Sequence, residues 1–322
     1  MKQVSKDALL EALRNKDGPY DGHTHTTVSD GVLPLAGLVK LAAEQGIAHL
    51  AITDHDFPLH PRKARILSLR YGIDVIPGVE LNVIHRVLGR NVLIHLGLLG
   101  LPGDDDELNA LLAHNQNLPM EQYVLAMLHK LYALGLDPSG QGVEASFALL
   151  RQRNPGCKYI GKGHVSQFLA DTGLVSSRAE AGYLYLGEHG ERRAYVAKED
   201  LFDYIRMEQV LKVISRLNRQ RARATVVTLN HPYHYRLEQD LPLLIRDFDY
   251  LGGHAIEVYY PKHTPERVRF LQDQCRAHGL LENIGSDYHY DAHQLVAGDP
   301  NLFRRLRQVH RKEWKPHGKD WW

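Results

Sequence analysis

The sequence predicts an α/β barrel with a helical insertion. Short apolar segments alternate with segments of helical periodicity over residues 20–100, and the same alternation resumes over residues 158–284. Alternation with short links is typical of βαβ units, in which helices cover a parallel sheet. Between these regions apolar residues recur at helical spacing alone. We therefore expect residues 1–322 to form one barrel domain, with an inserted helical segment over 101–157 and a tail over 304–322.

The first half of the barrel should begin with a short amphipathic helix that Ser5 caps and Gly18-Pro19 ends. Apolar runs bounded by turn residues predict strands over 20–25, 48–53, 74–83 and 92–99. Helical spacing between Pro and Gly signals predicts helices over 34–45 and 62–71. Pro77-Gly78 predicts a break in the third strand, because proline cannot donate to a strand ladder.

The inserted segment is predicted to be helical throughout. Leu108 and Leu112, then Tyr123, Met127 and Leu131, recur at helical spacing, and no strand pattern interrupts them. The acidic run 104–107 is best explained as a helix start with a solvated face rather than as a metal site. Two positions for the insertion remain open: it caps the site, or it packs on the outside of the barrel.

The second half should complete the barrel. Strands are predicted over 225–229, 255–260 and 281–284, and helices over 165–170, 198–219, 237–246 and 265–278. The tail over 304–322 is basic and aromatic, and the sequence assigns it no function.

Composition excludes several classes of protein. The 322 residues carry a formal net charge of +1 and are 43% hydrophobic, which argues against a broad basic face for extended duplex nucleic acid. Only two cysteines are present, so a disulfide framework is not expected. No apolar run reaches the ~20 residues that a membrane span needs, and residues 1–13 lack the apolar core of a signal peptide. We expect a cytoplasmic protein without a membrane anchor, whose oligomeric state the sequence does not determine.

Histidine and acidic residues stand at or near the ends of the predicted strands. They are His23, His25, Asp30, His55, Glu80, His95, His164, Asp287 and His289. In parallel α/β sheets functional residues gather at the carboxyl ends of the strands, so these side chains should converge. Imidazole and carboxylate suit Zn, Mn and Fe, and a set this large can hold more than one ion. The sequence therefore predicts a multinuclear metal site.

These motifs, in this order, resemble those of the polymerase and histidinol phosphatase (PHP) family. The matching stretches are Asp21-Gly22-His23-Thr24-His25 through Gly31, Thr53-Asp54-His55-Asp56, Pro77-Gly78-Val79-Glu80, Ile94-His95-Leu96-Gly97, Gly163-His164, Asn230-His231-Pro232 and Gly285-Ser286-Asp287-Tyr288-His289. The subgroup that acts as nucleotide phosphoesterase or short-RNA exonuclease is the most similar. The resemblance implies an irregular (β/α)7-type barrel.

The resemblance also implies three divalent metal ions, which could be Mn, Zn or Fe. The first ion would be held by His23, His25, Glu80 and Asp287. The second would be held by Glu80, His95 and His164, with Glu80 bridging. The third would be held by Asp30, His55 and His289.

The expected activity is metal-dependent phosphoester hydrolysis by a hydroxide that bridges two metals. Two close ions bind phosphoryl oxygens and lower the pKa of a shared water toward ~7. Three ions bring a charge of +6 and the three carboxylates bring −3, so a surplus of about +3 would favour a phosphate dianion. The expected substrate is a small phosphorylated metabolite, a nucleotide or the end of a short oligonucleotide.

His231 is the candidate catalytic residue outside the ligand set. It could protonate the leaving oxygen, hold the substrate, orient a ligand, or play only a structural part before Pro232. Asp54 and Asp56 flank His55 and are expected to support the turn or a ligand. The candidate phosphate contacts are Arg90, Lys162, Arg193 and Arg236, each of which, taken alone, is better explained as an ordinary surface cation.

Two other functions remain open. A metal-dependent amidohydrolase acting on a C–N bond could use the same ligands, and only the charge surplus weighs against it. A non-catalytic, metal-stabilised binding domain is the third possibility, although a structural site needs fewer ions and no open coordination position. Turnover of a phosphoester, with inhibition by phosphate, would separate the first function from both alternatives.

Overall fold

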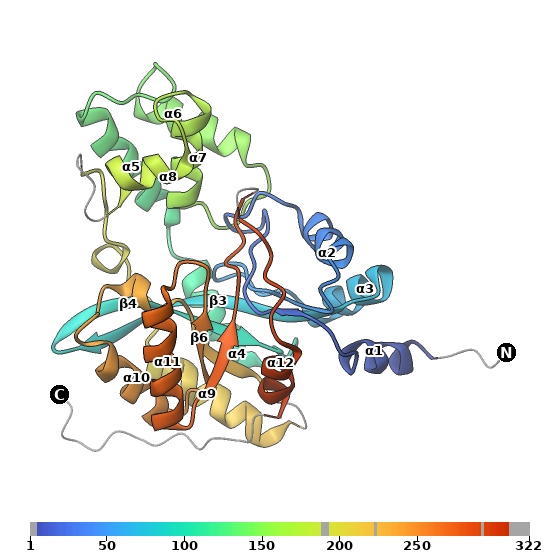
Figure 1. Ribbon diagram of the computed structural model, residues 1–322. Helices are drawn as coiled ribbons and strands as arrows, with labels where there is room; N and C mark the ends of the chain where they lie inside the picture. The colour runs from blue at the N-terminus through green and yellow to red at the C-terminus, as the bar shows by residue number, and fades with distance from the viewer. Residues whose placement is uncertain (1–4, 188–192, 222–223, 291–292, 309–322) are drawn as a thin grey trace. The chain divides into compact units, whose positions relative to one another are not determined.

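The computed structural model describes residues 5–187, 193–221, 224–290 and 293–308 (Figure 1). The chain divides into two compact units. The barrel unit comprises Met1–Thr26, Gly31–Gln116 and Tyr204–Trp322, and the helical unit comprises Thr27–Asp30 and Asn117–Asp203. The helical unit therefore begins after residue 116 and extends well beyond residue 157, whereas the sequence-based insertion covers 101–157. The part of the predicted tail beyond residue 308 lies outside the described residues.

The barrel unit is built on a seven-stranded sheet whose spatial order follows the chain. Its strands are β1 (Tyr20–Asp21), β2 (His49–Ile52), β3 (Asp74–Val87), β4 (Arg90–Leu99), β5 (Val226–Leu229), β6 (Ala255–Tyr259) and β7 (Leu281–Ile284). The segments after β1 and β7 meet: the Gly22 N–H donates to the Ile284 carbonyl at 3.1 Å, and the Asp287 N–H to the His23 carbonyl at 2.9 Å. The sheet is thus nearly closed, which confirms the predicted irregular α/β barrel.

The prediction of an all-parallel sheet is wrong at β4. This strand runs antiparallel to both β3 and β5, while the other neighbouring pairs are parallel. A two-residue turn at Leu88-Gly89 joins β3 to β4, and both residues have positive φ, 47° and 81°. This is the backbone that a tight hairpin turn requires, and glycine adopts it without steric cost. The strand-turn-strand connection leaves no room for a crossover helix.

The predicted break at Pro77-Gly78 is also wrong, since β3 runs through it without interruption. The reason is a change of partner within the strand. Residues 74–77 pair with β2, and residues from 78 onward pair with β4. Pro77 occupies the last position of the first pairing, where the loss of one N–H donor disturbs no further rung of the ladder.

Helices cover the outside of the barrel unit (Figure 1). They are α1 (Lys6–Arg14), α2 (Leu35–Glu44), α3 (Pro61–Tyr71), α4 (Asp106–Gln116), α9 (Met207–Gln220), α10 (Leu241–Tyr250), α11 (Pro265–His278) and α12 (Pro300–Arg307), with a short 3-10 turn η3 (Pro232–Tyr235). Helix α3 packs on β3, α11 on β6 and α12 on β7. Ser5 caps α1 by accepting the Ala8 N–H at 3.1 Å, as its position in the sequence indicated.

The core of the barrel unit has three parts. The largest lies between the sheet from β3 to β6 and helices α9 to α11, and it includes fully buried Leu96. A second part joins α2 and α3 to β2. The third gathers Tyr20, Ala51, Val226 and Ala255 with Phe303 of α12. Because Tyr20 and Ala255 begin β1 and β6, this last part closes the barrel at the amino ends of its strands.

The helical unit consists of short helices, as the periodicity predicted. They are α5 (Met120–Ala133), α6 (Val143–Arg153), α7 (Lys162–Asp171), α8 (Arg178–Ala181), the π-helical turn η1 (Gly182–Leu186) and the 3-10 turn η2 (Lys198–Asp200). Residues 120, 124, 127, 128 and 131 of α5 form its buried stripe. Among the residues that the structure describes, no helix is both long and apolar enough to cross a membrane.

Two predicted helix starts are wrong. The predicted helix over 198–219 begins only at Met207, because residues just before it run beside β3: the Ile84 N–H donates to the Ile205 carbonyl at 2.9 Å. The predicted helix over 237–246 begins at Leu241, with Pro242 in its first turn. In both cases the helical spacing of apolar residues begins several residues before the first residue of the helix, so the spacing alone predicts the start too early.

Candidate metal centre

The strands of the barrel unit bring seven predicted ligands to one end of the sheet. His23 and His25 follow β1, and His55 follows β2. Glu80 and His95 lie within β3 and β4, where Glu80 faces His55 across an isolated bridge between their backbones. The other two, Asp287 and His289, follow β7. Because β1, β2 and β7 point the same way, the loops after them meet, as the sequence predicted.

One group of four ligand atoms fits a single ion. His23, His25, Glu80 and Asp287 each offer one donor atom, and these atoms lie within 4.8 Å of one another. The Nε2 atoms of His23 and His25 are 3.0 Å apart, and each also lies within 3.5 Å of an oxygen of Glu80 and of Asp287 Oδ1. These are the four residues that the family resemblance implied for the first ion.

Two further groups share members with the first. His55, Glu80 and His95 offer donor atoms within 4.8 Å of one another, and so do His25, His55 and His289. Both oxygens of Glu80 take part: Oε1 lies 3.3 Å from His95 Nδ1, and Oε2 lies 3.2 Å from His55 Nδ1. A carboxylate placed in this way can bridge two ions. His55 belongs to both groups here, whereas the sequence prediction placed it with the third ion alone.

The donor set fits divalent metal ions. Every member is an imidazole or a carboxylate, and these are the ligands that Zn, Mn and Fe accept. Within the described ranges, Glu80 Oε2 and Asp287 Oδ1 are buried and accept no hydrogen bond, although imidazole nitrogens lie within 3.3 Å of each. A buried carboxylate oxygen without a hydrogen bond is costly unless a cation compensates it. These orphaned oxygens indicate a place for positive charge.

The electrostatics of the cluster point the same way. Burial disfavours the charged imidazolium of His25, but Asp287 and Glu80 more than offset this and raise its pKa to about 10. Burial would likewise raise the pKa of Asp287, yet the surrounding imidazoles, His289 first, lower it well below its usual value. The field that holds a proton on His25 would equally hold a metal cation at its Nε2.

The buried carboxylate of Glu257, in β6, holds two histidines of this region in position. Glu257 Oε1 lies 2.9 Å from His23 Nδ1, and its Oε2 accepts the backbone N–H of His231 at 2.7 Å. If Nδ1 of His23 donates this proton, its Nε2 keeps a lone pair for the ligand cluster. Gly285 makes the contact possible, because a Cβ there would lie 2.3 Å from both Glu257 Oε1 and His23 Cβ.

Other acidic residues hold the loops rather than the cluster. Asp54 accepts the backbone N–H and the hydroxyl of Thr26, both at 2.7 Å. Asp56 accepts the backbone N–H of Asn82 at 3.0 Å. Asp21 accepts the N–H groups of Ser286 and Val296, and burial, only partly offset by these bonds, raises its pKa to about 6. Asp54 and Asp56 therefore support the turn around His55, as expected.

His231 lies against the cluster in a constrained backbone. Its Nε2 is 2.8 Å from Glu80 Oε1, while its Nδ1 is buried without a hydrogen-bond partner. The backbone φ of His231 is 25°, and that of Asp287 is 53°. Such values cost of order 1–3 kcal/mol outside glycine and persist where the surrounding structure holds them. Two hydrogen bonds do so here: from the His231 N–H to Glu257, and from the Tyr260 hydroxyl to Asp287 Oδ2 at 3.1 Å.

The two remaining predicted ligands, Asp30 and His164, belong to the helical unit. His164 is buried in α7, where its Nδ1 accepts the Gly161 N–H at 3.2 Å and its Nε2 lies 3.4 Å from Cys157 Sγ. Asp30 lies 3.9 Å from the guanidinium of Arg178 in the same unit. Their membership of the metal centre remains a prediction.

The predicted phosphate contacts are divided between the units. Arg90 begins β4 at the tip of the hairpin, mostly exposed and 3.5 Å from Asp240. Arg236 is exposed just after η3. Lys162 and Arg193 are exposed in the helical unit. The role of all four remains a prediction.

Three supporting residues were missed by the sequence reading: Glu257, Asn230 and Tyr260. Asn230 donates to Glu80 Oε1 at 3.0 Å, and it stands in a stretch already noted for His231. Glu257 had a usable signal, since it is the one charged residue in the apolar strand Ala-Ile-Glu-Val-Tyr. A lone carboxylate in a buried strand needs a partner. Tyr260 had no comparable signal.

Comparisons with known proteins agree with this geometry. A family model described as "PHP domain" matches residues 21–201. The "5'-3' exoribonuclease Rnm" of Escherichia coli is 28% identical over 304 residues, which cover 93% of this chain and 90% of that protein. The "3',5'-nucleoside bisphosphate phosphatase" of Chromobacterium violaceum is 27% identical over 275 residues, covering 84% and 86%.

A solved structure supports the fold. It is an amidohydrolase from Chromobacterium violaceum with bound sulfate and no metal, and it superposes with a TM-score of 0.71. The two chains are 24% identical, and the match covers 90% of this chain and 96% of the other. The family match spans more than half of the chain, and it includes the segments that carry His23, His25, His55, Glu80 and His95. This protein belongs to the PHP domain family.

Proposed function

We propose that this protein is a metal-dependent phosphoesterase that acts on nucleotides or on the ends of short oligonucleotides. The observation that carries the proposal is the set of imidazole and carboxylate donor atoms, nearly all from buried residues, in which two groups share Glu80. Two carboxylates and five imidazoles in the barrel unit would leave a surplus of positive charge once more than one divalent ion is bound. A surplus of this sign favours an anionic phosphate over a neutral amide.

The relatives support the same class of substrate. The proteins from Escherichia coli and Chromobacterium violaceum are named for cleavage of RNA and of a nucleoside bisphosphate, and both match over most of their length. A third relative, from Eggerthella lenta, is named "Phosphoribosyl 1,2-cyclic phosphate 1,2-diphosphodiesterase". All three names describe cleavage of a phosphoester next to a ribose. We therefore place the substrate among ribose-linked phosphoesters.

We assign metal-binding roles to residues of the barrel unit and to two residues of the helical unit. His23, His25, Glu80 and Asp287 would hold the first ion, and Glu80 would also serve a neighbouring ion together with His55 and His95. Asp30 and His164 would be the further ligands that the sequence predicts, and the expected number of ions is three. When bound, paired divalent ions neutralise phosphoryl oxygens and lower the pKa of a water that they share.

We assign His231 to the leaving group. Its Nε2 is held by Glu80, its backbone N–H is held by Glu257, and its buried Nδ1 has no hydrogen-bond partner. When the ring is an imidazolium, its Nε2 proton stays with Glu80 and its Nδ1 carries the second proton, which it can donate to a departing oxygen. Proton donation matters most when the leaving oxygen is a poor leaving group, and this provides a test.

The first experiment combines metal content with activity. Metals per chain would be counted by elemental analysis in wild type, His23→Ala and Asp287→Ala. A panel of nucleoside bisphosphates, 5'-phosphorylated short RNAs and aryl phosphates would then be assayed with added Mn or Zn. His129→Ala, which removes an exposed histidine of α5, is the matched control. Both site variants should lose metal and activity, while the control should keep both.

Two results would overturn the proposal. One is full activity in both site variants, which would show that the clustered ligands do not serve catalysis. The other is a metal-loaded wild type that hydrolyses an amide but no phosphoester. For His231, the alanine variant should lose activity on nucleotides by ~100-fold or more and keep most of its activity on p-nitrophenyl phosphate, whose leaving group needs no proton. Equal losses on both substrates would exclude the leaving-group role.

A further inference from the structure

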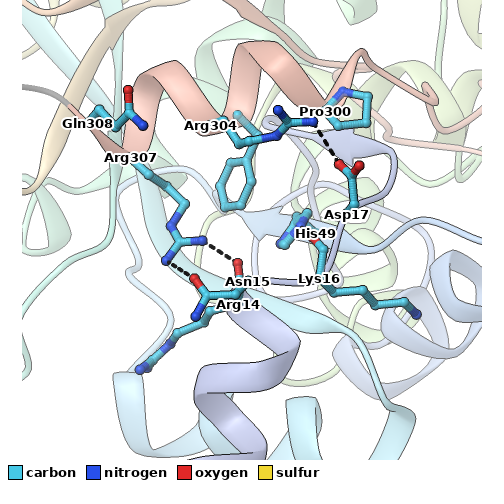
Figure 2. A pocket seen from close by; sticks show the side chains of 10 residues that line it. Arg14, Asn15, Lys16, Asp17, His49, Pro300, Arg304, Arg307 and Gln308 are labelled. Carbon is cyan, nitrogen blue, oxygen red and sulfur yellow. Dashed lines mark hydrogen bonds and ion pairs between the residues drawn. The ribbon is translucent and has the colours of Figure 1, made fainter.

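A cationic pocket of about 540 Å³ lies at the opposite end of the barrel from the predicted metal ligands. Figure 2 shows the residues that line it. Its walls are the end of α1, the turn that leads into β1, the first residue of β2 and helix α12. These segments stand at the amino ends of β1 and β2, whereas His23, His25 and His55 follow the carboxyl ends of the same strands. The pocket is therefore separate from the metal centre.

The lining of the pocket is strongly positive. It contains Arg14, Lys16, Arg304 and Arg307 and a single carboxylate, Asp17, so four cations face one anion and the formal sum is +3. The whole chain has a net charge of only +1. Charge of one sign, concentrated in a concave site, attracts ions of the opposite sign.

Among the residues that the structure describes, two of the cations have no carboxylate partner. Arg307 donates to neutral oxygens only: the carbonyl of Arg14, and Asn15 Oδ1 at 3.1 Å (Figure 2). Within the described part of the chain, the ammonium group of Lys16 makes no hydrogen bond or ion pair. By contrast, Arg304 pairs with Asp17 at 3.0 Å, and Arg14 lies 3.8 Å from Glu11 and 4.0 Å from Asp74. Lys16 and Arg307 therefore leave positive charge available to a ligand.

The walls that carry these cations are held in place by packing. The Phe303 ring of α12 stacks on Tyr20 with a centroid distance of 4.8 Å and packs on His49 at 4.1 Å. His49, in turn, lies 2.8 Å through its Nε2 from the Lys16 carbonyl and 3.2 Å through its Nδ1 from Asp74. The backbone on both sides of the pocket is thus fixed to the closed end of the barrel, which lowers the entropic cost of binding.

We propose that this pocket binds a phosphate group, with Arg307 and Lys16 as its principal contacts. The guanidinium of Arg307 has N–H groups beyond the two that it donates to Arg14 and Asn15, and guanidinium N–H groups suit phosphate oxygens. Figure 2 shows the side chain of Lys16 extended away from Arg307, so this long, flexible side chain would turn to bring its ammonium to the same anion. The inference goes beyond the proposed hydrolysis, because it requires neither the metal ions nor their ligands. The phosphate could belong to a free small anion or to the backbone of single-stranded nucleic acid, and the two sources can be distinguished.

The test compares variants of the metal-loaded full chain. Calorimetric titration with inorganic phosphate would be carried out on wild type, Lys16→Gln, Arg307→Gln and Arg305→Gln. Arg305 is the matched control, since it removes one exposed charge from the same helix and does not line the pocket. Lys16→Gln removes no contact that holds the fold, so it remains informative if Arg307→Gln loosens α12. The metal centre is identical in all four proteins.

We expect Lys16→Gln and Arg307→Gln each to weaken phosphate binding by about fivefold or more, and Arg305→Gln to change it by less than ~2-fold. Hydrolytic activity should be unchanged in all three variants. Identical phosphate affinity in Lys16→Gln and Arg305→Gln would overturn the proposal, whatever the outcome for the metal centre.

A second titration identifies the source of the phosphate. It uses a fluorescent, single-stranded phosphorothioate oligonucleotide and follows anisotropy at several salt concentrations. If the nucleic acid backbone is the ligand, Lys16→Gln should weaken binding and lower the salt slope by about one phosphate contact. If Lys16→Gln weakens the binding of inorganic phosphate but leaves the binding of the oligonucleotide unchanged, the ligand is a free small anion. If Lys16→Gln weakens binding of neither inorganic phosphate nor the oligonucleotide, the proposal is contradicted for both sources of phosphate.

Discussion

Glu257→Gln is the substitution that best tests how the metal centre is organised. The change keeps the shape of a fully buried side chain but replaces one acceptor oxygen with a donor NH2 group. Glu257 faces two nitrogens, His23 Nδ1 at 2.9 Å and the His231 N–H at 2.7 Å. A glutamine can accept only one of these protons. The other nitrogen either loses its bond or, in the case of His23, changes tautomer and places its proton on Nε2.

The expected effect is a loss of metal affinity. A proton on His23 Nε2 removes the lone pair that would bind the first ion, and outer-shell substitutions of this kind typically cost about 10–100-fold in affinity. That factor corresponds to roughly 1.4–2.8 kcal/mol. Competition with a chromogenic chelator would measure the affinity. Thermal unfolding in excess chelator would report the stability of the metal-free fold separately.

Glu282→Gln is the matched control. Glu282 lies on the neighbouring strand β7, and its Oε2 accepts the hydroxyl of Tyr259 at 2.6 Å, away from the ligands. The control should keep the affinity of wild type. Two outcomes would show that metal binding by His23 does not depend on Glu257. One is a metal affinity of Glu257→Gln within ~2-fold of wild type, and the other is an equal loss of affinity in both variants.

Three further predictions concern the fold and its cysteines. Arg216 donates to both oxygens of Asp105 at 2.8 and 2.9 Å, and these bonds offset partial burial to hold the pKa of Asp105 below its usual value. Arg216→Gln should therefore cost about 0.5–1 kcal/mol in urea unfolding at pH 7, and the difference from wild type should disappear as the pH falls through that lowered pKa. Burial raises the pKa of Cys275 to about 12, so roughly one thiol in ten thousand is ionised at pH 8, and mass spectrometry should find no iodoacetamide adduct before unfolding. Leu96→Ala empties a fully buried position in the largest part of the core and should lower the free energy of unfolding by about 2–5 kcal/mol; a loss below ~1 kcal/mol would mean that the site collapses around the smaller side chain.

Much of the ligand set was predictable because its signals are local. His23, His25, His55, Asp287 and their neighbours stand directly after short apolar strands, and each strand is recognisable from adjacent residues. Once the strands are parallel, their carboxyl ends meet, and the convergence needs no knowledge of detailed packing. The clustering of these seven side chains in the barrel unit could be predicted for this reason.

Two features of the sheet were predicted wrongly. In each, the neighbouring strand, rather than the residue pattern of the segment itself, decided the structure. Pro77 looked like a strand break, but it lies where β3 changes from β2 to β4 as its neighbour. The βαβ alternation suggested parallel strands throughout, yet the turn at Leu88-Gly89 folds β4 back along β3. Both features depend on which strand lies alongside, and periodicity within one strand does not report that.

The sequence by itself determined the α/β class, the PHP-type motifs and the residues able to hold metal ions, because periodicity and ligand chemistry are properties of neighbouring residues. Only the tertiary structure decided that Glu257 supports His23 across 234 positions of the chain. It alone also brought Arg307 to the carbonyl of Arg14 and so formed the cationic pocket. Such contacts join segments far apart in sequence, and they exist only because closure of the sheet brings β1 beside β7 and α12 against its end.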